Sequence, residues 1–167
     1  VLELVRKTAE LATPKEIVWI DGSEAQLESL RKIAVETGEL IKLNEEKLPG
    51  CYLNRSDVND VARVEGRTFI CSKTREAAGP TNNWMDPDEM KAKLHEILRC
   101  AMTDRTMYVI PYSMGVIGSP FAKYGIEVTD SIYVVLNMAI MTRIGTKVLE
   151  ALGGSSDVIL GVHTKAK

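Results

Sequence analysis

Two hydrophobic patterns alternate along the chain, one with a period of two residues and one with the spacing of a helix. The segment Glu16–Ile20 is short and apolar, and an Asp21-Gly22 turn follows it. Ser23 can cap a helix after this turn, and Gly38 can end it. Four apolar residues recur there at helical spacing, namely Leu27, Leu30, Ile33 and Ala34. The pattern predicts a strand, a turn and a helix.

A second helix is predicted from Asp86 onward. Asp86 can cap it, Pro87 suits its first turn, and Glu89 stands where a capping box requires an acidic residue. Its expected apolar face consists of Met90, Leu94, Ile97, Leu98 and Ala101. His95 falls beside this face, which favours a structural or solvent-edge histidine over a catalytic one.

The rest of the chain continues the alternation. "RTMYVIP" and "GIEVTDS" are typical of strands, and the glycine-bearing stretch "YSMGVIGSP" connects them. A long helix is expected over 132–152, capped by Asp130 or Ser131, weakened or bent by Gly145, and followed by a short strand in "DVILGV". Strands and helices therefore alternate through most of the chain. This favours an α/β fold with a mixed or mainly parallel β-sheet flanked by helices.

Composition narrows the function classes. The chain has 167 residues, 45% hydrophobic and 26% charged, which suits one domain over 1–167. A net charge of -2 argues against a nucleic-acid or anionic-membrane surface, although a local basic cluster can still bind a small anion. The longest apolar run, 132–141, is far shorter than the roughly 20 residues of a membrane span.

The cysteines and histidines argue against a zinc site. Cys51, Cys71 and Cys100 lie far apart, and only His95 and His163 could join them. Their odd number and the lack of a recognisable signal sequence lead us to expect reduced thiols in a cytoplasmic protein.

One charged segment, "SDVNDVARVEGRTFICSK", is a candidate binding surface. If it is a strand, Arg63, Glu65 and Arg67 share one face. They form either a solvated face or a cleft wall on which Arg63 binds a carboxylate or phosphate through two hydrogen bonds. The residues alone support both interpretations equally. Asp57 and Asp60 are better explained as turn caps than as metal ligands.

Other candidate sites are weaker. The chain has no G-x-x-x-x-G-K-[ST] phosphate loop and no G-x-G-x-x-G dinucleotide fingerprint. In "SMGVIGSP" a tight turn is favoured over an anion-binding loop, and at Ser23 plain helix capping is favoured over phosphate binding.

Three blocks of the sequence resemble one known family. "DVARVEGRTFI", "GPTNNWMDP" and the long block from "RTMYVIP" to "VLEALG" occur in the order found in the amino-terminal half of GTP-dependent phosphoenolpyruvate carboxykinases. The resemblance runs from about Asp21 to Leu152. It implies the amino-terminal domain of an enzyme that converts oxaloacetate and GTP to phosphoenolpyruvate, GDP and carbon dioxide with Mn²⁺ or Mg²⁺. It also implies that Arg63 binds the substrate carboxylate or phosphate and that Glu65 contacts the closed lid.

The chain lacks the family's other catalytic and binding groups. The family's phosphate loop, metal ligands, reactive cysteine, guanine-binding aromatics and lid have no counterpart, so no catalytic, metal-binding or nucleotide-binding residue is assigned. The three cysteines do not replace the family's reactive cysteine, and the two histidines do not replace its metal ligands. The resemblance therefore implies an inactive fragment whose partner is the carboxy-terminal catalytic domain. The alternative is a stand-alone, non-catalytic anion-binding or scaffold domain, and an independent small phosphotransferase fits poorly.

An interdomain face is expected to be exposed in such a fragment. Its candidate residues surround the glycine connection, namely Met114, Val116, Ile117 and Phe121. Self-association through this face would be incidental.

Overall fold

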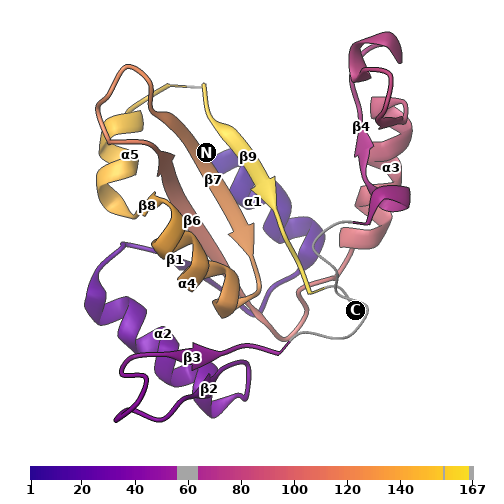
Figure 1. Cartoon of the computed structure of the whole chain (residues 1–167). Helices are drawn as coiled ribbons and strands as arrows, with labels where there is room; N and C mark the ends of the chain where they lie inside the picture. Colours follow the sequence, from indigo (N-terminus) through magenta and orange to yellow (C-terminus); the bar gives the residue numbers. More distant parts are fainter. Residues whose placement is uncertain (56–63, 156, 166–167) are drawn as a thin grey trace. The chain divides into compact units, whose positions relative to one another are not determined.

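The chain forms two compact units. The computed structural model describes residues 1–55, 64–155 and 157–165 (Figure 1). One unit, the sheet unit, contains Val1–Arg55 and Cys100–Lys167, and the other, the inserted unit, is Ser56–Arg99. The inserted unit thus interrupts the sequence of the sheet unit. The single domain predicted for 1–167 stays a prediction.

A mixed five-stranded sheet organises the sheet unit. Its order is β1 (Glu16–Trp19), β6 (Thr106–Met114), β7 (Lys123–Thr129) and β9 (Ile159–Val162), and β8 (Arg143–Ile144) also pairs with β6. The β1–β6 and β7–β9 pairs are parallel, whereas β7 and β8 run antiparallel to β6. The predicted α/β fold with a mixed sheet is confirmed.

Two hydrophobic clusters cover opposite faces of this sheet. Because strand residues alternate in direction, Val109 and Val128 belong to the cluster with α1 (Leu2–Ala12). Tyr108 and Ile110 belong to the other cluster, with α2 (Glu24–Glu36) and α4 (Ile132–Met141). Figure 1 shows α1 behind the strands and α4 in front of them. Helix α1 is not among the predicted elements.

The predicted helix over 132–152 is wrong, because the chain forms three elements there. Helix α4 ends at Met141, β8 follows, and α5 (Thr146–Leu152) begins after Gly145. Gly145 has a φ of 108°, and a Cβ there would clash with the Asp21 carbonyl. Gly145 N–H donates to Pro111 O at 2.9 Å and Thr146 N–H to Asp21 O at 3.1 Å. Contacts with neighbouring segments therefore replace the helical hydrogen bonds.

The start of α2 agrees with the prediction. The Ser23 hydroxyl accepts a hydrogen bond from Gln26 N–H at 3.2 Å, and the Asp21 carboxylate accepts one from Ser23 N–H at 2.7 Å. The hydrogen bonds from Ser23 lower the pKa of Asp21. Gly38, with a φ of 77°, follows the helix, and a short antiparallel pair, β2 (Ile41–Lys42) and β3 (Tyr52–Leu53), comes next.

The described part of the inserted unit, residues 64–99, contains five short elements. They are the 3-10 helix η1 (Glu65–Arg67), β4 (Phe69–Ile70), the 3-10 helix η2 (Glu76–Ala78), β5 (Asn83–Trp84) and α3 (Pro87–Leu98). The Asp86 carboxylate caps α3 by accepting hydrogen bonds from Asp88 N–H and Glu89 N–H, as predicted. No residue of α3 is buried, and Leu94 and Ile97 are exposed. Met90 and Leu98 are half-buried, and Ala101, which was expected on the same face, lies beyond the end of α3 and is buried. Only part of the expected apolar face thus remains exposed within the described residues.

Candidate functional site

The structure describes only part of the predicted binding segment over 56–73. Arg63, Asp57 and Asp60 lie outside the described residues, whereas Glu65 and Arg67 form η1. The expectation that Glu65 and Arg67 share one face of a strand is wrong, because 65–67 is a turn of 3-10 helix. Arg67 N–H donates to Val64 O at 3.0 Å and Thr68 N–H to Glu65 O at 3.2 Å. These bonds close the turn. The directions of the Glu65 and Arg67 side chains therefore follow the three-residue period of a 3-10 helix and not the alternation of a strand.

Asn83 holds this turn in place from a distant part of the sequence. Its side-chain amide donates to Glu65 O at 2.6 Å and to Thr68 O at 3.2 Å. The second block of the family resemblance, "GPTNNWMDP", thus contacts the first, "DVARVEGRTFI". Sequence reasoning did not single out Asn83. The adjacent pair of asparagines was the available signal, since this side chain often bonds to backbone groups in turns.

Parallel pairing of β4 with β5 strengthens the contact between these two blocks. Phe69 stands opposite Asn83 and Ile70 opposite Trp84. The indole N–H of Trp84 donates to Ser72 O at 2.9 Å. The inserted unit therefore has a built framework beneath the turn that carries Glu65.

The side chains of the turn are available for binding. Glu65 and Arg67 are both exposed, and no described side chain forms an ion pair with either. A carboxylate and a guanidinium on one short turn, just after Arg63 in sequence, can interact with a charged ligand or with another protein segment. The arrangement alone does not identify that partner.

The glycine connection between β6 and β7 forms a tight turn. Gly118 N–H donates to the Tyr124 hydroxyl at 2.9 Å, and Phe121 N–H donates to the Ser119 hydroxyl at 3.2 Å. Ser119 N–H and Ala122 N–H also bond within the turn. Because these N–H groups are already used, the geometry favours the tight-turn interpretation over an anion-binding loop. Met114 at the end of β6 and Val116 and Phe121 on the connection are exposed, as expected, whereas Ile117 is half-buried.

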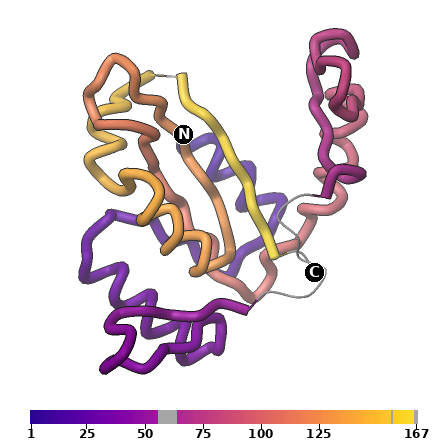
Figure 2. The backbone as a smooth tube through the Cα atoms, viewed as in Figure 1, coloured from indigo at the N-terminus to yellow at the C-terminus, as the bar shows by residue number. Residues whose placement is uncertain are grey.

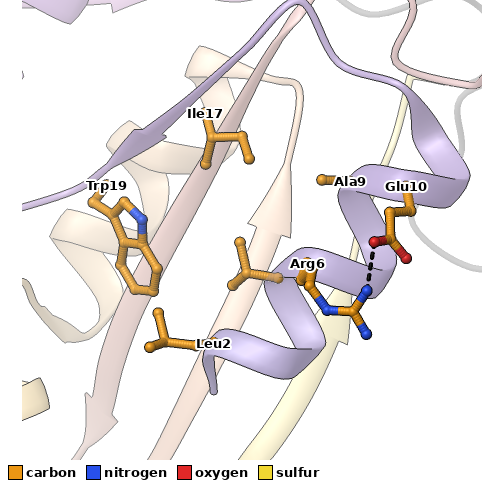
Figure 3. A pocket seen from close by; sticks show the side chains of 7 residues that line it. Leu2, Arg6, Ala9, Glu10, Ile17 and Trp19 are labelled. Carbon is orange, nitrogen blue, oxygen red and sulfur yellow. Dashed lines mark hydrogen bonds and ion pairs between the residues drawn. The ribbon is translucent and has the colours of Figure 1, made fainter.

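A hollow lies beside α1 and β1 in the sheet unit. Figure 3 shows the side chains of Leu2, Ile17 and Trp19 around it, with the Arg6–Glu10 ion pair at one side. Its lining is mainly apolar, and its two charged residues already neutralise each other. The hollow therefore offers little chemistry for an anionic substrate.

A polar network at the start of α4 was missed by the sequence analysis. The buried Asp130 carboxylate accepts hydrogen bonds from Arg105 Nε at 2.8 Å, Thr164 Oγ1 at 2.9 Å and Lys165 N–H at 2.9 Å. The predicted alternative cap, Ser131, caps α4. The only signal for Asp130 was its position next to a helix start, and its partners lie 25 to 35 residues away.

Glu39 extends this network. Its carboxylate accepts hydrogen bonds from the Ser131 hydroxyl at 2.8 Å, Tyr133 N–H at 2.9 Å and Lys165 Nζ at 2.9 Å. Burial raises the pKa of Glu39, but the bonds from Tyr133, Lys165 and Ser131 together hold it below its ordinary value. The network therefore joins four segments that are distant in sequence, and its role is structural.

The two histidines do not form a site with the cysteines. His163 Nδ1 lies 2.8 Å from the Thr129 hydroxyl, and His95 is exposed on α3. Cys51, Cys71 and Cys100 are free and exposed. In the described ranges, no group of three His, Cys, Asp or Glu residues is arranged to hold a metal ion. Likewise, no helix of these ranges is long and apolar enough to cross a membrane.

Comparison with known proteins identifies relatives over nearly the whole chain. The family model described as "Phosphoenolpyruvate carboxykinase N-terminal domain" matches residues 3–167. Proteins named "Phosphoenolpyruvate carboxykinase [GTP]" are similar to it in Corynebacterium kroppenstedtii (53% identity), Neocallimastix frontalis (51%) and Chlamydia muridarum (49%). Each match covers 98% of this chain but only 26% or 27% of the relative. The chain thus spans about a quarter of the length of these relatives.

Proposed function

The chain belongs to the phosphoenolpyruvate carboxykinase N-terminal domain family, and we propose that it is the substrate-contacting amino-terminal domain of a GTP-dependent enzyme of this kind. The full-length enzyme would convert oxaloacetate and GTP to phosphoenolpyruvate, GDP and carbon dioxide. The observation that carries the proposal is about 50% identity over 98% of the chain to proteins bearing that name. We further propose a cytoplasmic location, as expected for reduced, exposed thiols.

Arg63 is the proposed substrate-binding residue. A guanidinium presents two parallel N–H groups to a carboxylate or a phosphate. Oxaloacetate carries carboxylates, and phosphoenolpyruvate carries a carboxylate and a phosphate. A cation placed there would stabilise negative charge that moves during decarboxylation and phosphoryl transfer. Two residues on, the turn held by Asn83 exposes Glu65. This exposure suits the proposed contact between Glu65 and a mobile lid.

The nucleotide and metal ions belong to the proposed carboxy-terminal domain. GTP supplies the transferred phosphoryl group, and Mn²⁺ or Mg²⁺ neutralises its charge when bound. The described residues do not fit a metal site, so no step of the reaction is assigned to a metal held by them. The 167-residue chain by itself should therefore bind substrate weakly and not turn it over.

The test of this proposal uses the full-length protein with Arg63→Ala and Arg63→Lys. Loss of a charge-assisted, bidentate contact should lower kcat/KM for oxaloacetate by about 10- to 200-fold, because such a contact contributes about 1.5 to 3 kcal/mol. Arg63→Lys should recover only part of this loss, since an ammonium group cannot bind bidentately. Arg75→Ala, in an exposed arginine of the inserted unit, is the matched control.

Two results would contradict the proposal. An unchanged dependence on oxaloacetate and phosphoenolpyruvate in Arg63→Ala, with an unchanged melting temperature, would remove Arg63 from the substrate site. A native gene product of 18.5 kDa, detected by immunoblot, would favour the stand-alone binding or scaffold domain instead. A band several times larger is the expected result.

A further inference from the structure

Strand β9 forms an open edge of the five-stranded sheet. It pairs with β7 alone, and the described strands place no neighbour on its other side. Because His163 N–H donates to Val128 O, strand alternation directs the N–H groups of Leu160 and Val162 away from β7. Figure 2 shows β9, in yellow, following the outer side of β7 within the sheet unit. The outer edge of β9 therefore offers backbone donors and acceptors for another strand.

Both faces of β9 carry exposed apolar side chains. Ile159 is 53% exposed on one face, and Leu160 and Val162 are 51% and 39% exposed on the other. Edge strands that remain in water are usually protected by lysine, proline or inward charges, and β9 contains none of these. Apolar residues on both faces are instead typical of a strand that is covered on both sides.

The carboxylate of Glu127 lies next to this edge without a partner. In the sheet register Glu127 stands opposite Gly161 of β9, where any side chain would clash with the carboxylate. Gly125 similarly leaves room for the Tyr112 ring. No hydrogen bond or ion pair from the described residues reaches Glu127, although it is half-buried. Burial raises the pKa of Glu127. Its carboxylate oxygens still reach solvent, because no fully buried side-chain oxygen of the described residues lacks a hydrogen bond. A segment that covered this carboxylate would therefore have to supply a donor, since buried polar groups in native proteins are nearly always hydrogen-bonded.

These features identify what is missing at the edge. A segment that covers β9 must add backbone hydrogen bonds along one side, apolar contacts on two faces, and a donor to Glu127. A second copy of this chain fits poorly, because it would bring another Glu127 carboxylate, and Lys165 is already paired with Glu39. In the relatives, about three quarters of the polypeptide lies outside the part that this chain matches, which is the amino-terminal domain.

We propose that the β9 surface, made of Ile159, Leu160, Val162 and Glu127, binds the polypeptide that follows this domain in the full-length protein. That polypeptide adds a strand beside β9 and supplies a cationic or amide donor to Glu127. Beta-strand addition gives affinity through backbone bonds and specificity through alternate side chains. The inference rests on the proposed function only in requiring that the chain is part of a longer protein.

Amide hydrogen exchange tests this interface directly. We expect the outward N–H groups of Leu160 and Val162 to exchange rapidly in the 167-residue chain and at least about 100-fold more slowly in the full-length protein. Equal exchange in the two proteins would overturn the proposal. So would slow exchange in the 167-residue chain, because the edge would then already be covered without the rest of the protein.

A pair of variants separates the interface from general stability. Leu160→Lys should leave the melting temperature of the 167-residue chain nearly unchanged but lower that of the full-length protein by at least about 4 °C. Leu48→Lys is the matched control, since Leu48 is 50% exposed and lies outside the β9 surface. Equal effects of the two variants on the full-length protein would contradict the proposal.

Two further outcomes keep this inference distinct from the proposed function. If the 167-residue chain forms dimers that Leu160→Lys dissociates, a second copy occupies the β9 surface and the proposal is wrong. If β9 is protected in a full-length protein that does not use oxaloacetate, the interface stands and the proposed enzymatic function falls.

Discussion

Asp130→Asn should strongly destabilise the chain, because this carboxylate is the centre of a buried polar network. Its side chain has 0% exposure, and it accepts three hydrogen bonds at 2.8 to 2.9 Å from Arg105, Thr164 and Lys165. The substitution keeps the volume of the side chain but removes its charge, and it turns one acceptor into a donor that faces other donors.

The expected loss is about 3 to 5 kcal/mol. This is the range for removing one partner of a buried ion pair. It is an upper estimate here, because the Arg105 side chain is 34% exposed and water compensates part of its charge. A domain is typically stable by about 5 to 15 kcal/mol, so the loss is a large part of the total. With a urea slope of about 2 kcal/mol per molar, the unfolding midpoint should fall by about 1.5 to 2.5 M.

Urea unfolding followed by circular dichroism measures this shift. Asp88→Asn is the control, because Asp88 pairs with Lys91 at 3.4 Å on the surface and its side chain is 92% exposed. Such a pair contributes about 0 to 1 kcal/mol. If Asp130→Asn shifts the midpoint no more than Asp88→Asn at an equal slope, the cost of burying Asp130 cancels its bonds, and the reasoning fails.

Three other predictions concern single positions. Gly145→Ala should destabilise the 167-residue chain by more than about 1 kcal/mol, because its φ is 108° and a Cβ would meet the Asp21 carbonyl, whereas Gly154→Ala, in open space, should have little effect in the same urea assay. Glu127→Gln should raise the melting temperature of the 167-residue chain at pH 7, because no covering segment supplies a donor to Glu127 there. Burial raises the pKa of Glu127 above its ordinary value of 4.5. Ionisation of Glu127 therefore costs more in the folded chain than in the unfolded one, and this cost lowers the stability as the pH rises above about 4.5. The gain should therefore shrink toward pH 4, and an equal gain at both pH values would contradict the stated cause. Asn83→Ala should speed amide exchange at Thr68 several-fold, since it removes two hydrogen bonds, each contributing about 1 kcal/mol, from the turn that carries Glu65.

The sequence pattern predicted those helices and strands that are determined by residues close together in the sequence. Ser23 and Asp86 cap their helices as expected because a cap depends on residues within one turn. The strands predicted in 16–20, 105–111 and 125–131 were also found, but β6 continues to Met114 into the predicted connection, and β7 begins at Lys123 and ends at Thr129. The fold class followed from the order of these elements.

Distant contacts explain what the sequence did not predict. The helical pattern of 132–152 is real, but Gly145 is drawn into contact with Asp21, more than 100 residues away in sequence, and the helix breaks there. Arg63, Glu65 and Arg67 alternate as on a strand, yet the Asn83 amide stabilises a 3-10 turn at the last two. A periodicity argument considers only neighbours and cannot detect such partners.

The same reasoning explains why the candidate site was proposed from a resemblance and not from the chemistry of its residues alone. Arg63 and Glu65 belong to the inserted unit, whose described elements bury few side chains and leave Leu94 and Ile97 of α3 exposed. A segment with so little core must be held by specific polar contacts, such as those of Asn83 and Trp84 with backbone carbonyls. Residues that hold the backbone in this way leave no hydrophobic period in the sequence. The resemblance to relatives, and not a periodic pattern, therefore led to the proposed roles of Arg63 and Glu65.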